Sequence, residues 1–183
     1  NGSTSGSVYI YERTSGNIWG NELKITASDA AANDWFGSDV SINGDYAIVG
    51  ARNDDDNGTD SGSVYIYERT SGNLWGNELK ITASDGAAND LFGSDVSISG
   101  DYVIVGARND DDNGTDSGSV YIYERASGNT WGNEFKITAS DGAANDLFGS
   151  AISISGDYAI VGARRDDDNG TDSGSVYIYR ISG

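Results

Sequence analysis

The sequence predicts an all-β protein made of repeated four-stranded antiparallel sheets. Two observations support this fold class. The segment GSVYIYER begins at Gly6, Gly62 and Gly118, and the shortened GSVYIYR begins at Gly174, so a unit of 56 residues recurs along the chain. Within each unit, short segments that alternate apolar and polar residues are separated by turn-forming residues, which is the pattern of antiparallel strands. No segment shows helical periodicity, and a fixed period of this size is typical of propellers and other arrays.

The copy that begins at Gly62 shows the expected elements in order. Its first strand alternates aliphatic and aromatic residues, and its second alternates apolar and polar ones. The third strand places Val96 and Ile98 on the inward face. The fourth strand, YVIVGA, is nearly all apolar, so we expect it to be buried on both faces. These strands are expected at residues 64–67, 79–83, 92–98 and 102–107, with a tight hairpin at 99–101 and a long polar loop at 109–117.

The whole chain, residues 1–183, is interpreted as one repeat array. Its repeats are expected at 6–61, 62–117 and 118–173, and 174–183 is taken as the first strand of a further copy. Four strands in about 50 residues suit one propeller blade, and propellers close with typically four to eight blades. Three blades and an overhang therefore predict a ring that is not closed within this chain. Three explanations stay open: a segment of a longer propeller, several chains that close a ring, or an open extended array.

The composition excludes several classes of function. The formal net charge is −18, which disfavours nucleic acid and anionic membrane surfaces as partners. No apolar run approaches the length of a membrane span, so no membrane insertion is expected. The chain has no Cys and no His, which rules out disulfides, zinc sites built on these residues, and thiol- or His-dependent catalysis.

The polar loop at 53–61 is the strongest chemical feature of each repeat. Read from Asn53, it places oxygen-bearing side chains at positions 1, 3, 5 and 9 and a glycine at position 6, which resembles the first part of a calcium loop. The acid expected at position 12 is missing, because Val64 stands there, and Arg165 occupies position 1 of the third copy. The alternative is an acidic solvated turn. Ca²⁺ is the one cofactor considered, and its candidate ligands are Asn53, Asp55, Asn57, Ser61, Asn109, Asp111, Asn113, Ser117, Asp167 and Asn169.

Two further motifs each allow two interpretations. Asn-x-Ser/Thr sequons mark candidate glycosylation sites, although a short sequon arises readily by chance and is copied with its repeat. A tryptophan recurs in each repeat and either plugs the space between blades, which we favour, or stacks on a sugar. The candidate glycosylated residues are Asn1, Asn57, Asn113 and Asn169, and the tryptophans are Trp19, Trp75 and Trp131.

No catalytic residue is expected. Two carboxylates could in principle hydrolyse a glycoside, and Asp29, Asp34 and Asp45 recur in each repeat. Their places beside turns give them a simpler explanation as caps and turn residues. The sequence therefore predicts a protein that is not an enzyme and has no cofactor-binding site other than the candidate calcium loops.

A family resemblance rests on two short motifs that recur in phase. Phe36-Gly37 followed by Val40 and then by residues 44–51 (GDYAIVGA) resembles the FG-GAP repeat. The resemblance covers the whole chain and implies propeller blades like those of integrin α subunits and of many bacterial and algal surface proteins. The motif recurs at Phe92-Gly93 with Val105-Gly106-Ala107, and at Phe148-Gly149 with Val161-Gly162-Ala163.

The sequence departs from the family pattern in two ways. Arg52, Arg108 and Arg164 stand where the family usually has proline. The hairpin at 43–45 is too short to hold the Asp-rich loop in which integrin-type repeats bind calcium. The family's calcium site therefore does not transfer to this hairpin.

These observations predict a non-enzymatic structural or adhesive repeat protein, extracellular or at the cell surface, that forms the building unit of a fibre or of a larger propeller assembly. Its expected partners are identical chains or the continuation of a longer repeat chain. The alternative is a calcium-dependent ligand-binding propeller domain that recognises a protein or a glycan.

Overall fold

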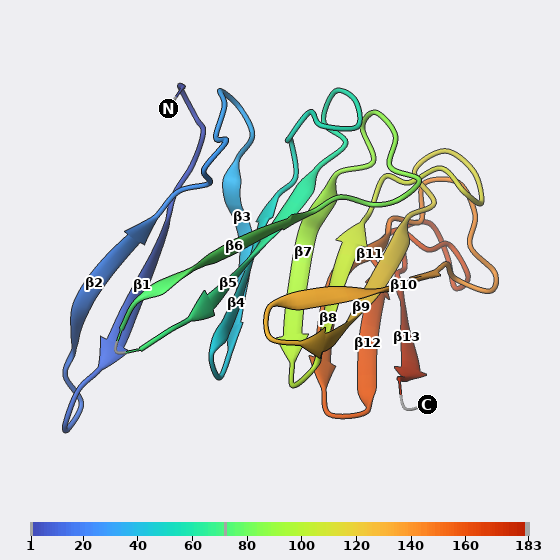
Figure 1. Cartoon of the computed structure of the whole chain (residues 1–183). Helices are drawn as coiled ribbons and strands as arrows, with labels where there is room; N and C mark the ends of the chain where they lie inside the picture. Colours follow the sequence, from blue (N-terminus) through green and yellow to red (C-terminus); the bar gives the residue numbers. More distant parts are fainter. Residues whose placement is uncertain (1, 72, 182–183) are drawn as a thin grey trace.

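The computed structural model describes residues 2–71 and 73–181 and contains only β-strands, turns and loops there. Four antiparallel sheets follow one another in chain order across the molecule (Figure 1). The strands are β1 (Val8–Arg13), β2 (Trp19–Ile25), β3 (Phe36–Asn43), β4 (Tyr46–Ala51), β5 (Ser63–Arg69), β6 (Trp75–Ile81), β7 (Phe92–Ser99), β8 (Tyr102–Ala107), β9 (Ser119–Ser127), β10 (Thr130–Ile137), β11 (Phe148–Ser155), β12 (Tyr158–Ala163) and β13 (Ser175–Arg180).

Two sheets have four strands and two are shorter. The first full blade is β3-β4-β5-β6 and the second full blade is β7-β8-β9-β10. The N-terminal half-blade is β1-β2, and the C-terminal blade is β11-β12-β13. None of these sheets closes into a barrel. The predicted fold class is therefore confirmed: all-β blades of antiparallel strands that form no closed ring within the described chain.

Each full blade crosses a boundary of the 56-residue sequence copies. The first full blade spans Phe36–Ile81, so its first two strands precede Gly62 and its last two follow it. The polar loop at 53–61 joins two neighbouring strands of one sheet, whereas the loop before Phe92 passes from one blade to the next. The loop with the acidic residues therefore lies within a blade.

The second strand of each full blade is an inner strand and is almost wholly buried, as its apolar sequence predicts. Residues 103–107 of β8 are all buried and Tyr102 is partly buried, since strands flank β8 on both sides. Val96 and Ile98 of β7 are also buried, as expected. The last strand differs from the sequence expectation, because β6 begins at Trp75 rather than at Leu79: a bulge in β6, where residues 77 and 78 oppose residue 67, keeps Trp75 and Gly76 paired with β5.

Consecutive blades pack face to face along a repeated seam. Strand β7 packs on β3, β4 and β5, and β11 packs on β7, β8 and β9. At the first seam the backbone N–H of Val96 donates to Asp39 Oδ2 at 2.7 Å, and that of Ile98 donates to Ser41 Oγ at 3.3 Å. At the second seam Ile152 and Ile154 donate in the same way to Asp95 and Ser97. Each bond joins residues 57 positions apart, one repeat plus one residue.

Glycines of the two recurring motifs allow the blades to approach this closely. A Cβ atom on Gly50 would lie 2.1 Å from the carbonyl oxygen of Gly93. A Cβ atom on Gly106 would lie 2.3 Å from the carbonyl oxygen of Gly149. Real side chains do not tolerate such distances, so the backbones meet directly at these two points.

The connections sort to opposite ends of the blades. The loops that follow β4, β6, β8, β10 and β12 gather at one end, and the tight hairpins β3–β4, β7–β8 and β11–β12 lie at the other (Figure 1). The acidic loops are thus displayed along one edge of the array. The described residues contain no helix that is long and apolar enough to span a membrane.

Candidate functional site

A lysine in each full blade gathers three carboxylates from two loops. Lys80 of β6 places its ammonium 2.8 Å from Asp29, 3.0 Å from Asp54 and 2.5 Å from Asp56. The Tyr65 hydroxyl lies 2.8 Å from Asp29 and 3.0 Å from Asp54. Tyr65 and Lys80 are direct partners across the β5–β6 ladder, so strand register brings them together. We call this group the lysine hub.

The second full blade repeats the lysine hub. Lys136 lies 2.8 Å from Asp85, 2.8 Å from Asp110 and 2.6 Å from Asp112. Burial alone would raise the pKa of Asp85, but hydrogen bonds from Lys136 and Tyr121 lower it overall. Burial, together with the neighbouring carboxylates, raises the pKa of Tyr121, so its hydroxyl keeps its proton and can donate it.

The buried acids Asp54 and Asp110 are the centres of the two hubs, and sequence reasoning missed them. Their exposed fractions are 4% and 3%. Asp54 Oδ1 also accepts from the Ser63 hydroxyl at 3.1 Å, and its backbone carbonyl accepts from Gly62 N–H at 2.8 Å. A usable signal was present: Lys80 alternates with the apolar Leu79 and Ile81, which directs it to the face opposite theirs.

The predicted calcium ligands are engaged in hydrogen bonds inside their own loops. Asn57 N–H donates to Ser61 Oγ at 3.1 Å, and Ser61 Oγ donates to the Asp54 carbonyl at 3.2 Å. Asn53 Nδ2 donates to Asp60 at 2.7 Å. The second loop keeps the first two bonds at Asn113 and Ser117, and the third keeps the first at Asn169. Asp55, Asp111 and Asp167 each accept from the backbone N–H of the aspartate five residues further on.

A metal ion would have to compete with these bonds for the same oxygen atoms. Across residues 2–71 and 73–181, no group of three acidic, His or Cys side chains has an arrangement that could hold one. In the two full blades, the buried carboxylates Asp54 and Asp110 already face an ammonium group. The residues present in these hubs therefore do not fit a calcium ion in addition to lysine. Calcium binding by the predicted ligands stays a prediction.

The structure describes three of the four candidate glycosylation sites. Asn1 lies outside the described residues. Asn57, Asn113 and Asn169 are exposed. The amide nitrogens of Asn57 and Asn113 donate to the carbonyls of Ala83 and Ala139 at 3.1 and 3.4 Å. A glycan there would have to coexist with these bonds, and glycosylation stays a prediction.

The three tryptophans differ in how much of the side chain is buried. Trp131 is 8% exposed and meets Tyr46 of the preceding blade edge to face, with ring centroids 5.7 Å apart. The guanidinium of Arg125 lies 4.6 Å from the centre of the same tyrosine ring. Trp75 is partly buried, and Trp19 is 65% exposed. Packing between blades is therefore the role of Trp131.

The carboxylates considered for catalysis serve turns and ion pairs. Asp34 accepts from the Ala31 N–H at 2.6 Å within a turn. Asp45 forms an ion pair with Arg69 across the β4–β5 pair, and Asp29 belongs to the first lysine hub. These three residues therefore have structural contacts that account for their places.

Two carboxyl groups share the first seam. Burial, and then the hydrogen bond and charge of Asp39, raise the pKa of Asp95 to about 7. Burial also raises the pKa of Asp90 to about 6. Because these folded-state values lie above the ordinary value of about 3.9, the folded chain binds more protons than the unfolded chain at mildly acidic pH.

This proton uptake predicts how stability changes with pH. The contribution of Asp95 is complete below its unfolded pKa and is lost as pH rises through about 7, so the free energy of unfolding should fall between about pH 4 and 7. Asp95→Asn should flatten that slope, and Asp157→Asn, an exposed hairpin position, should keep it. Urea unfolding at a series of pH values measures both. An unchanged slope in Asp95→Asn would show that the seam carboxyls do not share a proton.

Comparison with known proteins agrees with the 56-residue repeat. The FG-GAP repeat family matches the chain three times, at residues 19–67, 75–123 and 131–179. These matches cover well over half of the sequence. No curated protein matches the chain. Three consecutive matches, and glycines that bring successive blades into backbone contact, show that this chain belongs to the FG-GAP repeat family.

Proposed function

We propose that the chain is a non-enzymatic extracellular repeat protein with a structural or adhesive role, whose blades build a fibre or a larger propeller assembly. The observation that supports this most directly is the repeated seam. The glycine contact, the ladder of backbone donors and the apolar packing recur from the first seam to the second. A surface that recurs in this way can be extended by each further unit, as in other repeat arrays.

Family membership supports the same proposal. FG-GAP repeats build propeller-like domains that are typically extracellular or surface-associated and generally not enzymes. The acidic surface, with a net charge of −18, favours solubility and disfavours polyanionic partners. Further blades, from identical chains or from a longer repeat chain, are therefore the partners we propose.

Electron microscopy of the purified chain tests this proposal. We expect negative-stain images to show rings or fibres of blade-sized units, with a mass that rises with protein concentration in light scattering. Discrete monomers at every concentration would contradict the assembly role.

The second candidate is a calcium-dependent domain that binds a protein or a glycan. The display of three acidic loops along one edge favours it (Figure 1). The two candidates differ in their response to EGTA. For a structural array in which lysines neutralise the buried acids, EGTA should leave the melting temperature unchanged. A lower melting temperature in EGTA, restored by added Ca²⁺, would favour the calcium-dependent domain.

A further inference from the structure

The two ends of the array expose surfaces that the inner blades bury. On the C-terminal blade, Ile178 is 71% exposed, whereas the equivalent Ile122 of the second full blade is 7% exposed. On the first full blade, Val40 is 51% exposed, whereas the equivalent Val96 is 3% exposed. The two ends thus present the two halves of the seam that recurs inside the chain.

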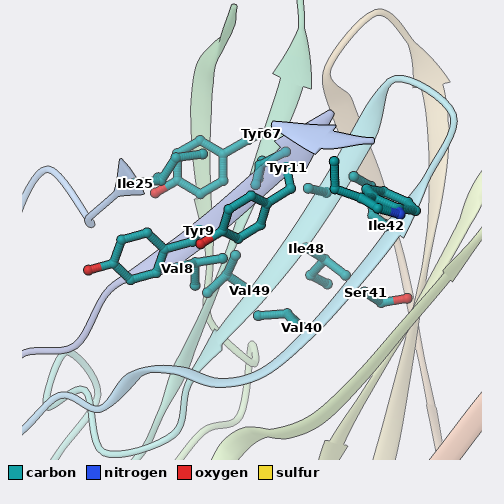
Figure 2. A pocket seen from close by; sticks show the side chains of 13 residues that line it. Val8, Tyr9, Tyr11, Ile25, Val40, Ser41, Ile42, Ile48, Val49 and Tyr67 are labelled. Carbon is teal, nitrogen blue, oxygen red and sulfur yellow. The ribbon is translucent and has the colours of Figure 1, made fainter. Parts of the chain in front are cut away.

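A groove of about 440 Å³ marks the N-terminal half of this surface. It lies between β1 and the face of β3 and β4, and Val8, Val40 and Ile48 are among its lining residues (Figure 2). At the inner seams the first strands of the preceding blade cover this face, as β3 and β4 cover β7. The N-terminal half-blade has only the equivalents of the last two strands, β1 and β2. The groove therefore lies where the first two strands of a complete blade would pack.

A second groove, of about 360 Å³, lies at the other end, beside Tyr102, Phe135 and Tyr179. Its equivalent at the first seam surrounds Tyr46, which packs edge to face against Trp131. Trp131 comes from the fourth strand of the following blade, and the C-terminal blade has three strands in the described chain. The tryptophan at the equivalent place in the repeat is Trp19 of β2, which is largely exposed.

The C-terminal blade also contains a lysine hub without its lysine. Tyr177 lies 2.8 Å from Asp141 and 2.9 Å from Asp166, as the tyrosines of the full hubs lie from their acids. Asp168 is the equivalent of Asp56. The lysine of a full hub comes from the fourth strand, and the equivalent residue on β2, Lys24, is exposed. Repulsion from Asp166 and Asp141 raises the pKa of Asp168, which agrees with uncompensated negative charge.

We propose that β2 of a second copy of this chain serves as the fourth strand of the C-terminal blade. Its Trp19 then packs against Tyr102, and its Lys24 enters the group formed by Asp141, Asp166 and Asp168. This inference rests on the proposed assembly function, and it specifies the joint between copies.

Strand pairing allows the exchange. In the single chain β2 pairs with β1, and β13 has a free edge beyond its pairing with β12. Strands β1 and β13 both carry the sequence VYIY, so β13 can replace β1 beside β2 and keep the three pairs that β1 makes with Ile25, Lys24 and Leu23. Strand β1 has no other sheet partner among the described strands, so we expect β1 to be released. Exchange of identical elements is a low-cost route to association.

The first full blade of the second copy then packs on the C-terminal blade in the way that consecutive blades pack inside one chain. Its β3 lies on β11, β12 and β13, as β7 lies on β3, β4 and β5. Gly37 of the second copy meets Gly162, as Gly93 meets Gly50 inside the chain. Once β1 is released, each copy supplies strands β2–β13, which is the content of three blades. Two copies joined at both ends would therefore close a ring of six blades, within the range that propellers use.

Two substitutions each disrupt one of the two surfaces that meet at this joint. Gly162→Ala adds a methyl group that meets only Ala151, at 3.5 Å, within the chain, but that would collide with the second copy. Lys24→Glu places a fourth acid in the C-terminal hub. We expect each substitution to weaken self-association by about a hundredfold. Arg13→Glu, an exposed position on β1, makes the same charge change and should leave association intact.

Sedimentation velocity and light scattering on the full chain test the joint. Gly162→Ala alone and Lys24→Glu alone should stay monomeric, with the melting behaviour of the dilute wild type. A mixture of the two should form a one-to-one dimer that grows no further, because only one pairing of ends remains intact. If the wild type assembles and either variant assembles equally well, or if the mixture stays monomeric, the joint is overturned while the assembly function stands. A wild type that is monomeric at all concentrations overturns both.

Discussion

Gly106→Ala should lower the free energy of unfolding by about 3 kcal/mol, the upper end of what overpacking usually costs. The added methyl group would lie 2.3 Å from the carbonyl oxygen of Gly149 and has only backbone to displace. To make room, the second full blade and the C-terminal blade must separate, which opens the apolar seam around Ile104 and Ile154. Urea unfolding followed by circular dichroism measures the loss.

The chain contains a matched control for this substitution. Gly162 occupies the equivalent position in the C-terminal blade, and a methyl group there makes an ordinary contact with Ala151 at 3.5 Å. Gly162→Ala should change the stability of the dilute, monomeric chain by no more than about 0.5 kcal/mol. Equal losses in both variants would mean that the cost arises within a strand rather than between blades.

Lys136→Met should destabilise the chain by about 3 kcal/mol. The change leaves Asp110, which is 3% exposed, beside Asp85 and Asp112 without the ammonium that now lies within 3 Å of all three. Breaking a buried ion pair from one side is costly because the remaining charge is neither solvated nor paired. Thermal and urea unfolding at neutral pH measure the effect.

Lys24→Met is the matched control for the loss of a hub lysine. Lys24 stands at the equivalent place on β2 but lies over the Tyr9 ring, 5.7 Å from its centre, rather than among carboxylates. In the dilute chain its replacement should have little effect. The double variant Lys136→Met, Asp110→Asn should recover part of the lost stability, because it removes the buried charge as well. If Lys136→Met unfolds at the same urea concentration as Lys24→Met, the lysine hub does not stabilise the blade.

The sequence alone was sufficient for the type of element and for much of the core. Alternation correctly placed Val96 and Ile98 inward, and the unbroken apolar run at 102–107 correctly indicated a central strand. These predictions succeeded because strand periodicity depends on residues close together in the chain. The tryptophan repeat also indicated packing between blades, and Trp131 has that role.

The starting point of a blade could not be read from the sequence period. A 56-residue window has the same period wherever it begins, so only strand pairing determines which four strands form a sheet. Pairing across the acidic loop places β4 and β5 in one sheet. The lysine hub was missed for a related reason: Asp29, Asp54 and Lys80 come from three separate segments, and spacing along one loop cannot reveal a contact between segments.

The offset of 57 residues across each seam has a consequence for how such chains change in length. In the ladder of backbone donors, each bond joins one residue to the next residue of the following copy, as Asp39 joins Val96 and Asp95 joins Ile152. If a whole copy is gained or lost by tandem duplication or deletion, each new junction inherits both partners together. The number of blades can therefore change in a single genetic step with no repair of the contacts, whereas an insertion of another length within a seam strand would shift the residues beyond it out of register with the neighbouring blade.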